Sequence, residues 1–197
     1  MIQLILFGPP GSGKGTQAAR LVDQFHLIHI STGDLFRYEI GNDTELGILA
    51  KSYMTKGNLV PDSVTIAMLR KKVAAHPDAN GFIFDGFPRT IAQAEALDTL
   101  LSESDDTIDA LIALEVDEDE IVSRILNRSL TSKRADDGNE AIIRKRIHVY
   151  RDETTPVFEY YDAKGLSHSI KGTGTVDSIY DKLQGIVVPL LAAQSEN

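Results

Sequence analysis

The chain has 197 residues, 42% of them hydrophobic, which is enough to bury one good core, so we expect a single domain with sub-lobes. A net charge of −9 argues against nonspecific nucleic-acid binding, and no apolar run reaches the roughly 18 residues that a membrane span needs. Without cysteine the chain forms neither a disulfide nor a thiolate metal site, which suits a reducing compartment, and we expect a cytoplasmic protein.

Hydrophobic periodicity predicts strands that alternate with helices along most of the chain. Strands are expected at residues 1–7, 27–30, 81–85, 109–116 and 166–171. Helices are expected at residues 14–26, 35–40, 45–56, 63–75, 90–101, 117–129, 141–150, 154–164 and 176–191, with a polar loop at 130–139. This order indicates an α/β fold, a three-layer arrangement in which a parallel five-stranded sheet carries helices on both faces. The three consecutive helices between residues 34 and 75 predict an inserted lobe.

A phosphate-binding loop follows the first strand directly. Residues 8–16 read Gly-Pro-Pro-Gly-Ser-Gly-Lys-Gly-Thr, and the spacing of the glycines and Lys14 fits G-x-x-x-x-G-K. Glycines let backbone N–H groups converge on a phosphate, and the next helix adds the positive end of its dipole. Lys14 supplies a mobile charge for a transferring phosphoryl group. The usual Ser/Thr after the lysine is replaced by Gly15, and a hydroxyl follows at Thr16.

A second informative stretch, Asp85-Gly86-Phe87-Pro88-Arg89-Thr90, follows an apolar strand. In this architecture an acid at a strand end lies beside the phosphate loop, where Asp85 can hold Mg²⁺ directly or through water. The alternative is an aspartate that merely caps the strand–helix turn. Arg89 can fork two hydrogen bonds to a phosphate.

Two arginines and a glutamine are further candidates. Arg124 and Arg128 are four residues apart, so both point from one helix face, although Arg124 could simply pair with Glu120 on a solvated face. Gln93 lies near a helix start, where its amide can both accept from and donate to the edge of a base. By itself, however, its position favours an exposed helical glutamine over a binding residue.

Together these motifs resemble the adenylate kinase family, whose members equilibrate ATP and AMP with two ADP. The likeness covers nearly the whole chain, and the combination is specific although each piece alone is not. It accounts for Gly15, because the family's loop carries Gly-Lys-Gly-Thr. The resemblance rests on residues 8–17, 31–37, 58–60, 85–93, 124, 128, 134–137 and 144–146.

The resemblance implies a site for each nucleotide and a set of catalytic side chains. The ATP site would comprise Gly11, Ser12, Gly13, Lys14, Gly15, Thr16, Arg124, Arg128 and Gly174. The AMP site would comprise Thr32, Arg37, Asn58, Leu59, Val60, Gly86, Phe87, Pro88, Arg89, Gln93, Arg134 and Arg146. Catalysis would fall to Lys14, Arg89, Arg124, Arg128, Arg134 and Arg146, and Asp85 would order Mg²⁺ through water. An extra residue before Arg146, relative to some members, leaves Arg144 as its rival.

The resemblance also implies a core of residues 1–30, 61–128 and 147–197, an AMP-binding lobe at 31–60 that extends to about 75 with the following helix, and a lid at 129–146. Residues 129–133 alone separate Arg128 from Arg134, so the lid is short, and no zinc is expected in it. We expect the two lobes to close over the core when both nucleotides bind. The implied cofactor is Mg²⁺, the partners are ATP, AMP and ADP, neither nucleic acid nor membrane is involved, and the chain is a monomer.

Three other functions are weighed against this one. A UMP/CMP kinase also has a short lid, but it usually carries Ala at the position of Thr32 and Asn at that of Thr90. A P-loop GTPase needs a guanine-reading Asn-Lys-x-Asp, which does not occur in the sequence. A noncatalytic nucleotide sensor would not need the full set of arginines.

Overall fold

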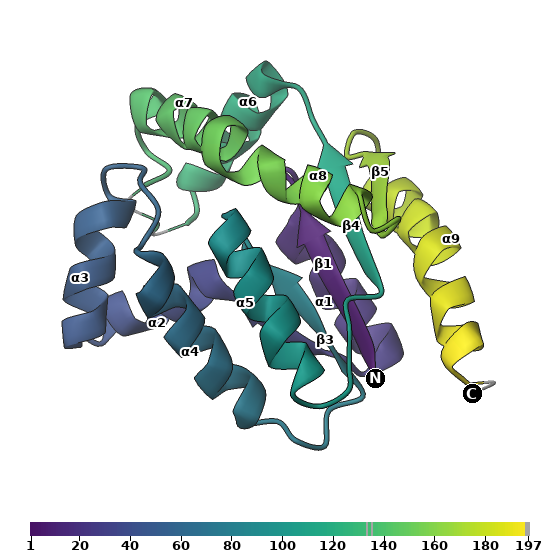
Figure 1. Ribbon diagram of the computed structural model, residues 1–197. Coiled ribbons are helices and arrows are strands. Elements are labelled where there is room, and N and C mark those ends of the chain that lie inside the picture. The colour runs from purple at the N-terminus through teal and green to yellow at the C-terminus, as the bar shows by residue number, and fades with distance from the viewer. Residues whose placement is uncertain (133, 135, 196–197) are drawn as a thin grey trace.

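A computed structural model describes residues 1–132, 134 and 136–195, with the side chains of 194 and 195 left aside. Its centre is one five-stranded sheet in the order β2-β3-β1-β4-β5, in which every neighbouring pair is parallel (Figure 1). The strands are β1 Ile2–Phe7, β2 Ile28–Ser31, β3 Gly81–Asp85, β4 Ala110–Glu115 and β5 Ser167–Lys171. The predicted α/β fold with a parallel five-stranded sheet is therefore confirmed.

Helices connect the strands and cover both faces of the sheet. They are α1 Lys14–Phe25, α2 Thr32–Gly41, α3 Glu45–Met54, α4 Asp62–Ala74, α5 Ile91–Ser102, α6 Glu118–Ser129, α7 Glu140–Val149, α8 Thr155–Asp162 and α9 Val176–Ser195. Capping follows the sequence signals: the side chains of Ser31, Thr44 and Thr90 each accept from a backbone N–H at the start of their helix.

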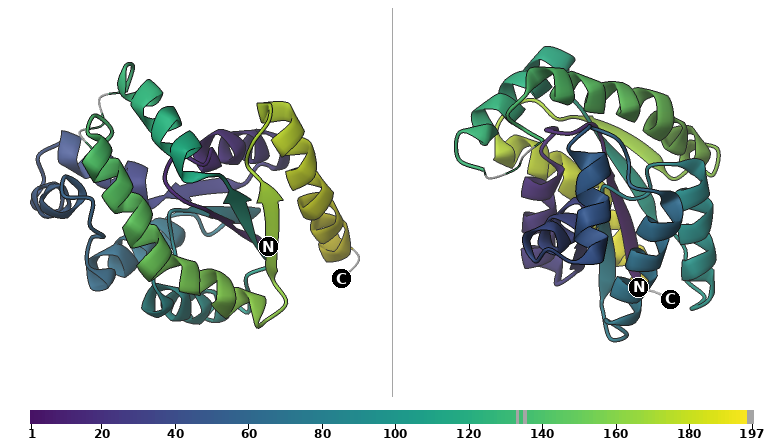
Figure 2. Two further views of the ribbon diagram at one scale, coloured as in Figure 1. Left: turned by 90° about the horizontal axis from the view of Figure 1, so that it is seen from above. Right: turned by 90° about the vertical axis from the view of Figure 1, so that its left-hand side faces the viewer.

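The predicted break between the helices at 141–150 and 154–164 is wrong. A π-helical turn, η1 Tyr150–Thr154, joins α7 to α8, and the Thr155 N–H donates to the carbonyl of Tyr150. Pro156 in the first turn of α8 has no N–H to donate four residues back. The wider turn absorbs this defect, so the helix continues instead of ending. Seen from above, α7, η1 and α8 run as one length beside the sheet (Figure 2).

Two apolar layers hold the sheet between its helices. Alternate residues of β1 face opposite ways: Ile5 and Phe7 join a core with α4, α5 and α8, whereas Leu4 and Leu6 join a core with α1 and α9. Ile5 and Leu4 are fully buried, so β1 is covered on both faces, as its unbroken apolar sequence predicts.

Two smaller clusters lie apart from the main layers. Phe36, Ala50 and Val60 form one, between α2, α3 and the approach to α4. Helices α2 and α3 can pack closely because Gly47 has no side chain. A Cβ at this position would come within 2.2 Å of the Glu39 carbonyl oxygen. The other cluster, which includes Ile125 and Ile147, joins α6 to α7. The pair α2 and α3 and the pair α6 and α7 therefore each have a small apolar core of their own.

The strand register brings the candidate site together. Leu6 on β1 and Ser31 on β2 both pair with Asp85 on β3. The phosphate-binding loop, the start of α2 and the turn after β3 consequently meet at one edge of the sheet, the carboxyl ends of parallel strands. No helix of the described residues is both long and apolar enough to cross a membrane.

Candidate active site

A cavity of about 970 Å³ opens at this edge of the sheet. Most of the residues that the sequence assigns to nucleotide sites line it. These are Gly11, Ser12, Gly13, Lys14, Gly15, Thr16, Arg37, Asn58, Leu59, Asp85, Gly86, Phe87, Pro88, Arg89, Arg124, Arg128, Arg134, Arg146 and Gly174. The cavity is continuous from the phosphate-binding loop to the end of α3, so groups on both sides share one space.

The phosphate-binding loop needs its glycines for backbone reasons. Gly8, Gly11 and Gly13 have φ of +137°, +80° and +99°, conformations that other residues rarely adopt. At Gly8 a Cβ would also meet the Leu114 carbonyl oxygen at 2.8 Å. The loop ends at the N-terminus of α1, where free N–H groups and the helix dipole favour an anion.

Lys14 folds back over this loop. Its Nζ donates to the carbonyls of Gly8 and Pro9, each at 2.8 Å. Burial lowers the pKa of Lys14 from 10.5 to about 8; Asp85 opposes this shift, and nearby arginines add to it. The pKa of Arg89 falls likewise, to about 10, because of burial and the charge of Arg146. The cations thus raise the free energy of one another, and a polyphosphate would relieve that repulsion.

Asp85 ends β3 with its side chain 13% exposed, and its Oδ2 lies 3.4 Å from Nε2 of His29. Burial alone would raise the pKa of Asp85, but His29, Lys14 and Arg89 outweigh it and hold the pKa below 3.8. The carboxylate is therefore ionised at neutral pH. Within the described part of the chain no group of three or more acidic, His or Cys residues could hold a metal ion. One carboxylate fits an ion that keeps most of its water, as Mg²⁺ does.

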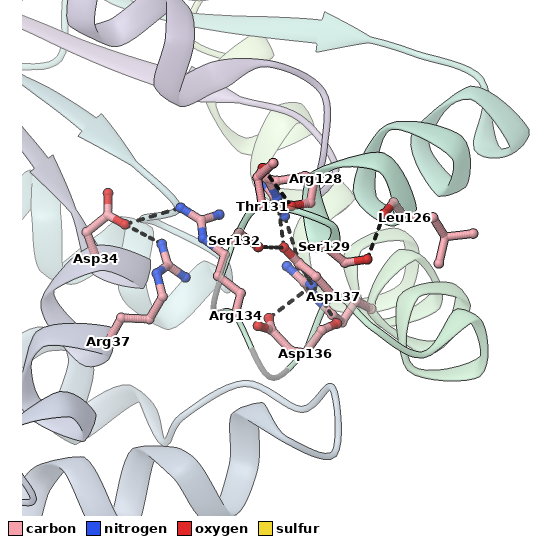
Figure 3. Close-up of polar contacts among 11 residues, drawn as sticks. Asp34, Arg37, Leu126, Arg128, Ser129, Thr131, Ser132, Arg134, Asp136 and Asp137 are labelled. Atoms are coloured by element: carbon pink, nitrogen blue, oxygen red, sulfur yellow. Dashed lines mark hydrogen bonds and ion pairs between the residues drawn. The ribbon is translucent and has the colours of Figure 1, made fainter.

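The arginines of α6 are each held by two contacts. Arg124 donates from Nε to Glu120 at 2.8 Å and from Nη1 to the Gly172 carbonyl at 3.0 Å, so it reaches the loop that carries Gly174. Arg128 forms a fork with Asp137, at 2.8 and 2.9 Å (Figure 3). The Arg124–Glu120 pair that the alternative expects is thus present, and both residues also line the cavity.

Asp137 is the shared acceptor of two ion pairs in the predicted lid. Its side chain has no exposed surface, and it accepts from Arg128 and, at 3.1 Å, from Arg146. Burial would raise the pKa of Asp137, but the two arginines outweigh it and lower the pKa. Arg146 also lies 3.0 Å from Asp136. One buried carboxylate therefore fixes two guanidiniums that face the cavity.

The two candidate lid arginines occupy different places. Arg146 lines the cavity, whereas Arg144 pairs with Glu118 at 2.8 Å and Glu140 at 2.9 Å and is not among the described residues that line it. Arg134, the other lid arginine, lies 3.5 Å from Asp34 of α2, which also accepts from Arg37 (Figure 3). Residues 133 and 135, which flank Arg134 in the predicted lid, lie outside the described residues.

Three predicted AMP-site residues lie behind the cavity wall instead of lining it. The Thr32 hydroxyl donates to the Gly86 carbonyl at 2.7 Å. Val60 is 6% exposed and belongs to the small core of α2 and α3. Gln93 is 2% exposed and accepts from the backbone N–H of Arg89. Periodicity and motif spacing place such residues near a site. They do not distinguish residues that line the cavity from residues packed behind the lining.

Sequence reasoning missed several residues that line the cavity, among them Gln17, Tyr150 and Thr154. Tyr150 and Thr154 face it because the π-helical turn rotates this part of the helix, for which the sequence carries no periodic signal. The Thr154 hydroxyl and the Gln17 side-chain oxygen are buried and have no hydrogen-bond partner among the described residues.

Six arginines among the described residues surround this one cavity. Such a concentration of fixed positive charge beside a glycine-rich loop suits a reaction that brings two phosphate chains together, because each chain repels the other. The fold and the cavity define the class of protein as a P-loop phosphotransferase.

Comparison with known proteins identifies the family within that class. A sequence model of the adenylate kinase family matches residues 6–166. The chain is 49% identical to an adenylate kinase of Flavobacterium psychrophilum over an alignment of 187 residues. The alignment covers 95% of this chain and 98% of the relative. The chain is 47% identical to one of Bacteroides thetaiotaomicron, covering 91% and 95%, and 45% identical to one of Streptomyces coelicolor, covering 90% and 94%. The chain belongs to the adenylate kinase family.

Proposed function

We propose that this cavity binds MgATP and AMP at the same time and transfers the terminal phosphoryl group reversibly between them, giving two ADP. One observation carries the proposal: a single continuous cavity joins the phosphate-binding loop to the end of α3, with arginines from both sides between them. Transfer needs no covalent intermediate here. Alignment of the two phosphates, neutralisation of their charge and exclusion of water account for the chemistry.

The residues divide the cavity into a donor side and an acceptor side. Residues 11–16, Arg124 and Arg128 would hold the donor's phosphates, and Gly174 would lie against its base. On the acceptor side Arg37 and Arg89 would hold the phosphate of AMP, with the backbone of residues 58–60 and 86–88 around the nucleoside. Lys14, Arg128, Arg134 and Arg146 would surround the transferring group, since charge develops there in the transition state.

We further propose that Mg²⁺ accompanies the donor, with Asp85 holding it through water. A bound magnesium ion supplies positive charge to the donor's phosphates. A hard oxygen donor at the loop, without sulfur ligands in the sequence, favours Mg²⁺ over zinc. A monomer suffices for the proposal, because every residue it uses comes from one chain.

A panel of acceptors at fixed MgATP tests the proposal. AMP, CMP, UMP and GMP are supplied at equal subsaturating concentration, and all nucleotides are quantified by ion-exchange chromatography. We expect AMP to react fastest, with two ADP formed for each AMP consumed, because a wrong base leaves buried polar groups unpaired at about 1–3 kcal/mol each. Faster reaction of CMP or UMP than of AMP would instead favour a pyrimidine monophosphate kinase.

A further inference from the structure

The loop between β5 and α9, residues 172–176, forms part of the cavity wall, and we call it the base loop. Two of its residues, Gly174 and Val176, line the cavity. Val176 is 47% exposed although it is apolar, and Gly174 offers backbone alone. An apolar side chain and bare backbone beside a cavity suit the flat face of a nucleotide base. The proposed function assigns the base of the donor to this loop.

The base loop is held at both of its ends by hydrogen bonds from helices. From α6, Arg124 donates through Nη1 to the Gly172 carbonyl at 3.0 Å. From α1, Gln17 donates through Nε2 to the Val176 carbonyl, also at 3.0 Å. Residues 173–176 are exposed, so burial contributes little to fixing them. The position of the base loop therefore depends on contacts of this kind.

Gln17 connects the base loop directly to the phosphate-binding loop. It follows Thr16, the last residue of the loop 8–16, and lies in the first turn of α1. Its backbone N–H donates to the Gly13 carbonyl at 3.2 Å, and the residue is only 2% exposed. One buried helical residue thus joins the segment expected to hold the donor's phosphates to the segment expected to hold its base.

The fold alone gives no reason for an amide at this buried position. Gln17 Oε1 is buried and has no hydrogen-bond partner among the described residues. An unpaired buried acceptor disfavours the folded state. Val176 is the first residue of α9, so its carbonyl also accepts a hydrogen bond within that helix. The bond from Gln17 is therefore not needed to satisfy this carbonyl, and the amide brings an unpaired oxygen with it.

We propose that Gln17 is a positioning residue for the donor nucleotide: by holding Val176 it fixes the base loop relative to the phosphate-binding loop. The inference rests on the proposed function, in which the donor is MgATP. With the base loop fixed, the base and the phosphates of one donor meet their contacts together. Without Gln17 the donor must order the base loop when it binds, and it loses affinity by that cost.

Gln17→Met in the full chain tests this role, because methionine fills a similar volume and cannot donate. Calorimetric titration compares the magnesium complexes of ATP and of inorganic tripolyphosphate, which has the three phosphates and no base. We expect the affinity for ATP to fall about threefold to tenfold, with the affinity for tripolyphosphate and the KM for AMP unchanged. The unfolding temperature should stay the same or rise, because the unpaired oxygen is removed as well. Gln17→Leu replaces this variant if it does not fold.

Gln24→Met is the matched control. Gln24 lies about two turns further along α1 and also binds α9, where it accepts from the Tyr180 hydroxyl at 2.6 Å and from Nε2 of Gln184 at 2.8 Å. It is not among the described residues that line the cavity. We expect this variant to bind both ATP and tripolyphosphate as the wild type does.

Three results would overturn the inference. The first is a Gln17→Met variant that binds ATP as tightly as the wild type. The second is a variant that loses as much affinity for tripolyphosphate as for ATP, since Gln17 would then act on the phosphate-binding loop alone. The third is failure of both Gln17 variants to fold, which would make the residue structural. A wild-type chain that forms no ADP from MgATP and AMP would show instead that the proposed function itself has failed.

Discussion

At the residue scale, Lys14 is a buried cation whose charged form is disfavoured before a ligand binds. Its ammonium group donates to two carbonyls of its own loop, Gly8 and Pro9, and its pKa is lowered to about 8 by burial and by neighbouring arginines. Phosphate oxygens would be better partners than neutral carbonyls, because they carry full negative charge. Under the proposed function, the lysine would leave the loop for the transferring phosphoryl group.

Replacement of this charge should remove catalysis and leave the fold intact. We expect Lys14→Met to lower kcat by about 10²–10³ or more, as when a single preorganised stabiliser of transition-state charge is removed. Steady-state kinetics measures the loss, and circular dichroism with thermal unfolding verifies the fold. Near-wild-type turnover in a folded variant would exclude Lys14 as the transition-state cation.

Asp85 gives a second residue-scale prediction, on metals. Because its carboxylate is ionised and stands without a cluster of further ligands in the described residues, the metal should belong to the nucleotide complex and not to the fold. We expect chelation with EDTA to abolish activity, addition of Mg²⁺ to restore it, and the unfolding temperature to stay the same throughout. Stoichiometric zinc in the purified protein, lost together with stability on chelation, would contradict this.

At the scale of elements, the sequence predicts those parts of the site whose conformation depends on their own residues. The glycines predict the loop 8–16, and an unbroken apolar run predicts that β1 is buried on both faces. The turn η1 has no such signal, because Tyr150 and Thr154 reach the cavity only through a widened helical turn. Gln93 and Thr32 differ again: their assignment to the AMP site stays a prediction, and packing buries both of them outside the cavity lining.

The predicted lid, residues 129–146, supplies a prediction at the scale of elements. Asp137 is buried between Arg128 and Arg146, so Asp137→Ala leaves two partly exposed guanidiniums without their shared acceptor. We expect stability to fall by about 2 kcal/mol, less than for a fully buried pair, and kcat to fall about tenfold or more as the arginines lose their positions. Urea unfolding and steady-state kinetics measure the two effects.

Glu140→Ala is the control for that variant, since it breaks a pair of similar geometry between Glu140 and Arg144 on the exposed side of α7. Its stability and kcat should stay close to those of the wild type. An Asp137→Ala variant with unchanged kcat would show that the ion pairs of the lid are structural and do not orient catalytic groups.

At the scale of the whole molecule, Arg134 of the predicted lid approaches Asp34 of α2 at 3.5 Å. Both side chains are partly exposed, so such a pair contributes about 0–1 kcal/mol at most and cannot by itself hold the lobes together. Simultaneous binding of two phosphate chains would add many stronger contacts from Arg37, Arg89 and Arg146. A ligand shifts the closure equilibrium only by this difference in contacts. The acidic partner of Arg134 was not foreseen in the sequence, where Asp34 reads as a first-turn helix residue.

Calorimetric titration with two adenosines joined by five phosphates tests most directly whether one cavity holds both nucleotides. Such a molecule spans the donor and the acceptor sides, so association entropy is lost once for two sets of contacts. We predict one molecule bound per chain, an affinity far above that of ATP or AMP alone, and competition with both nucleotides. Two molecules bound per chain, or an affinity no higher than that of ATP, would contradict the account.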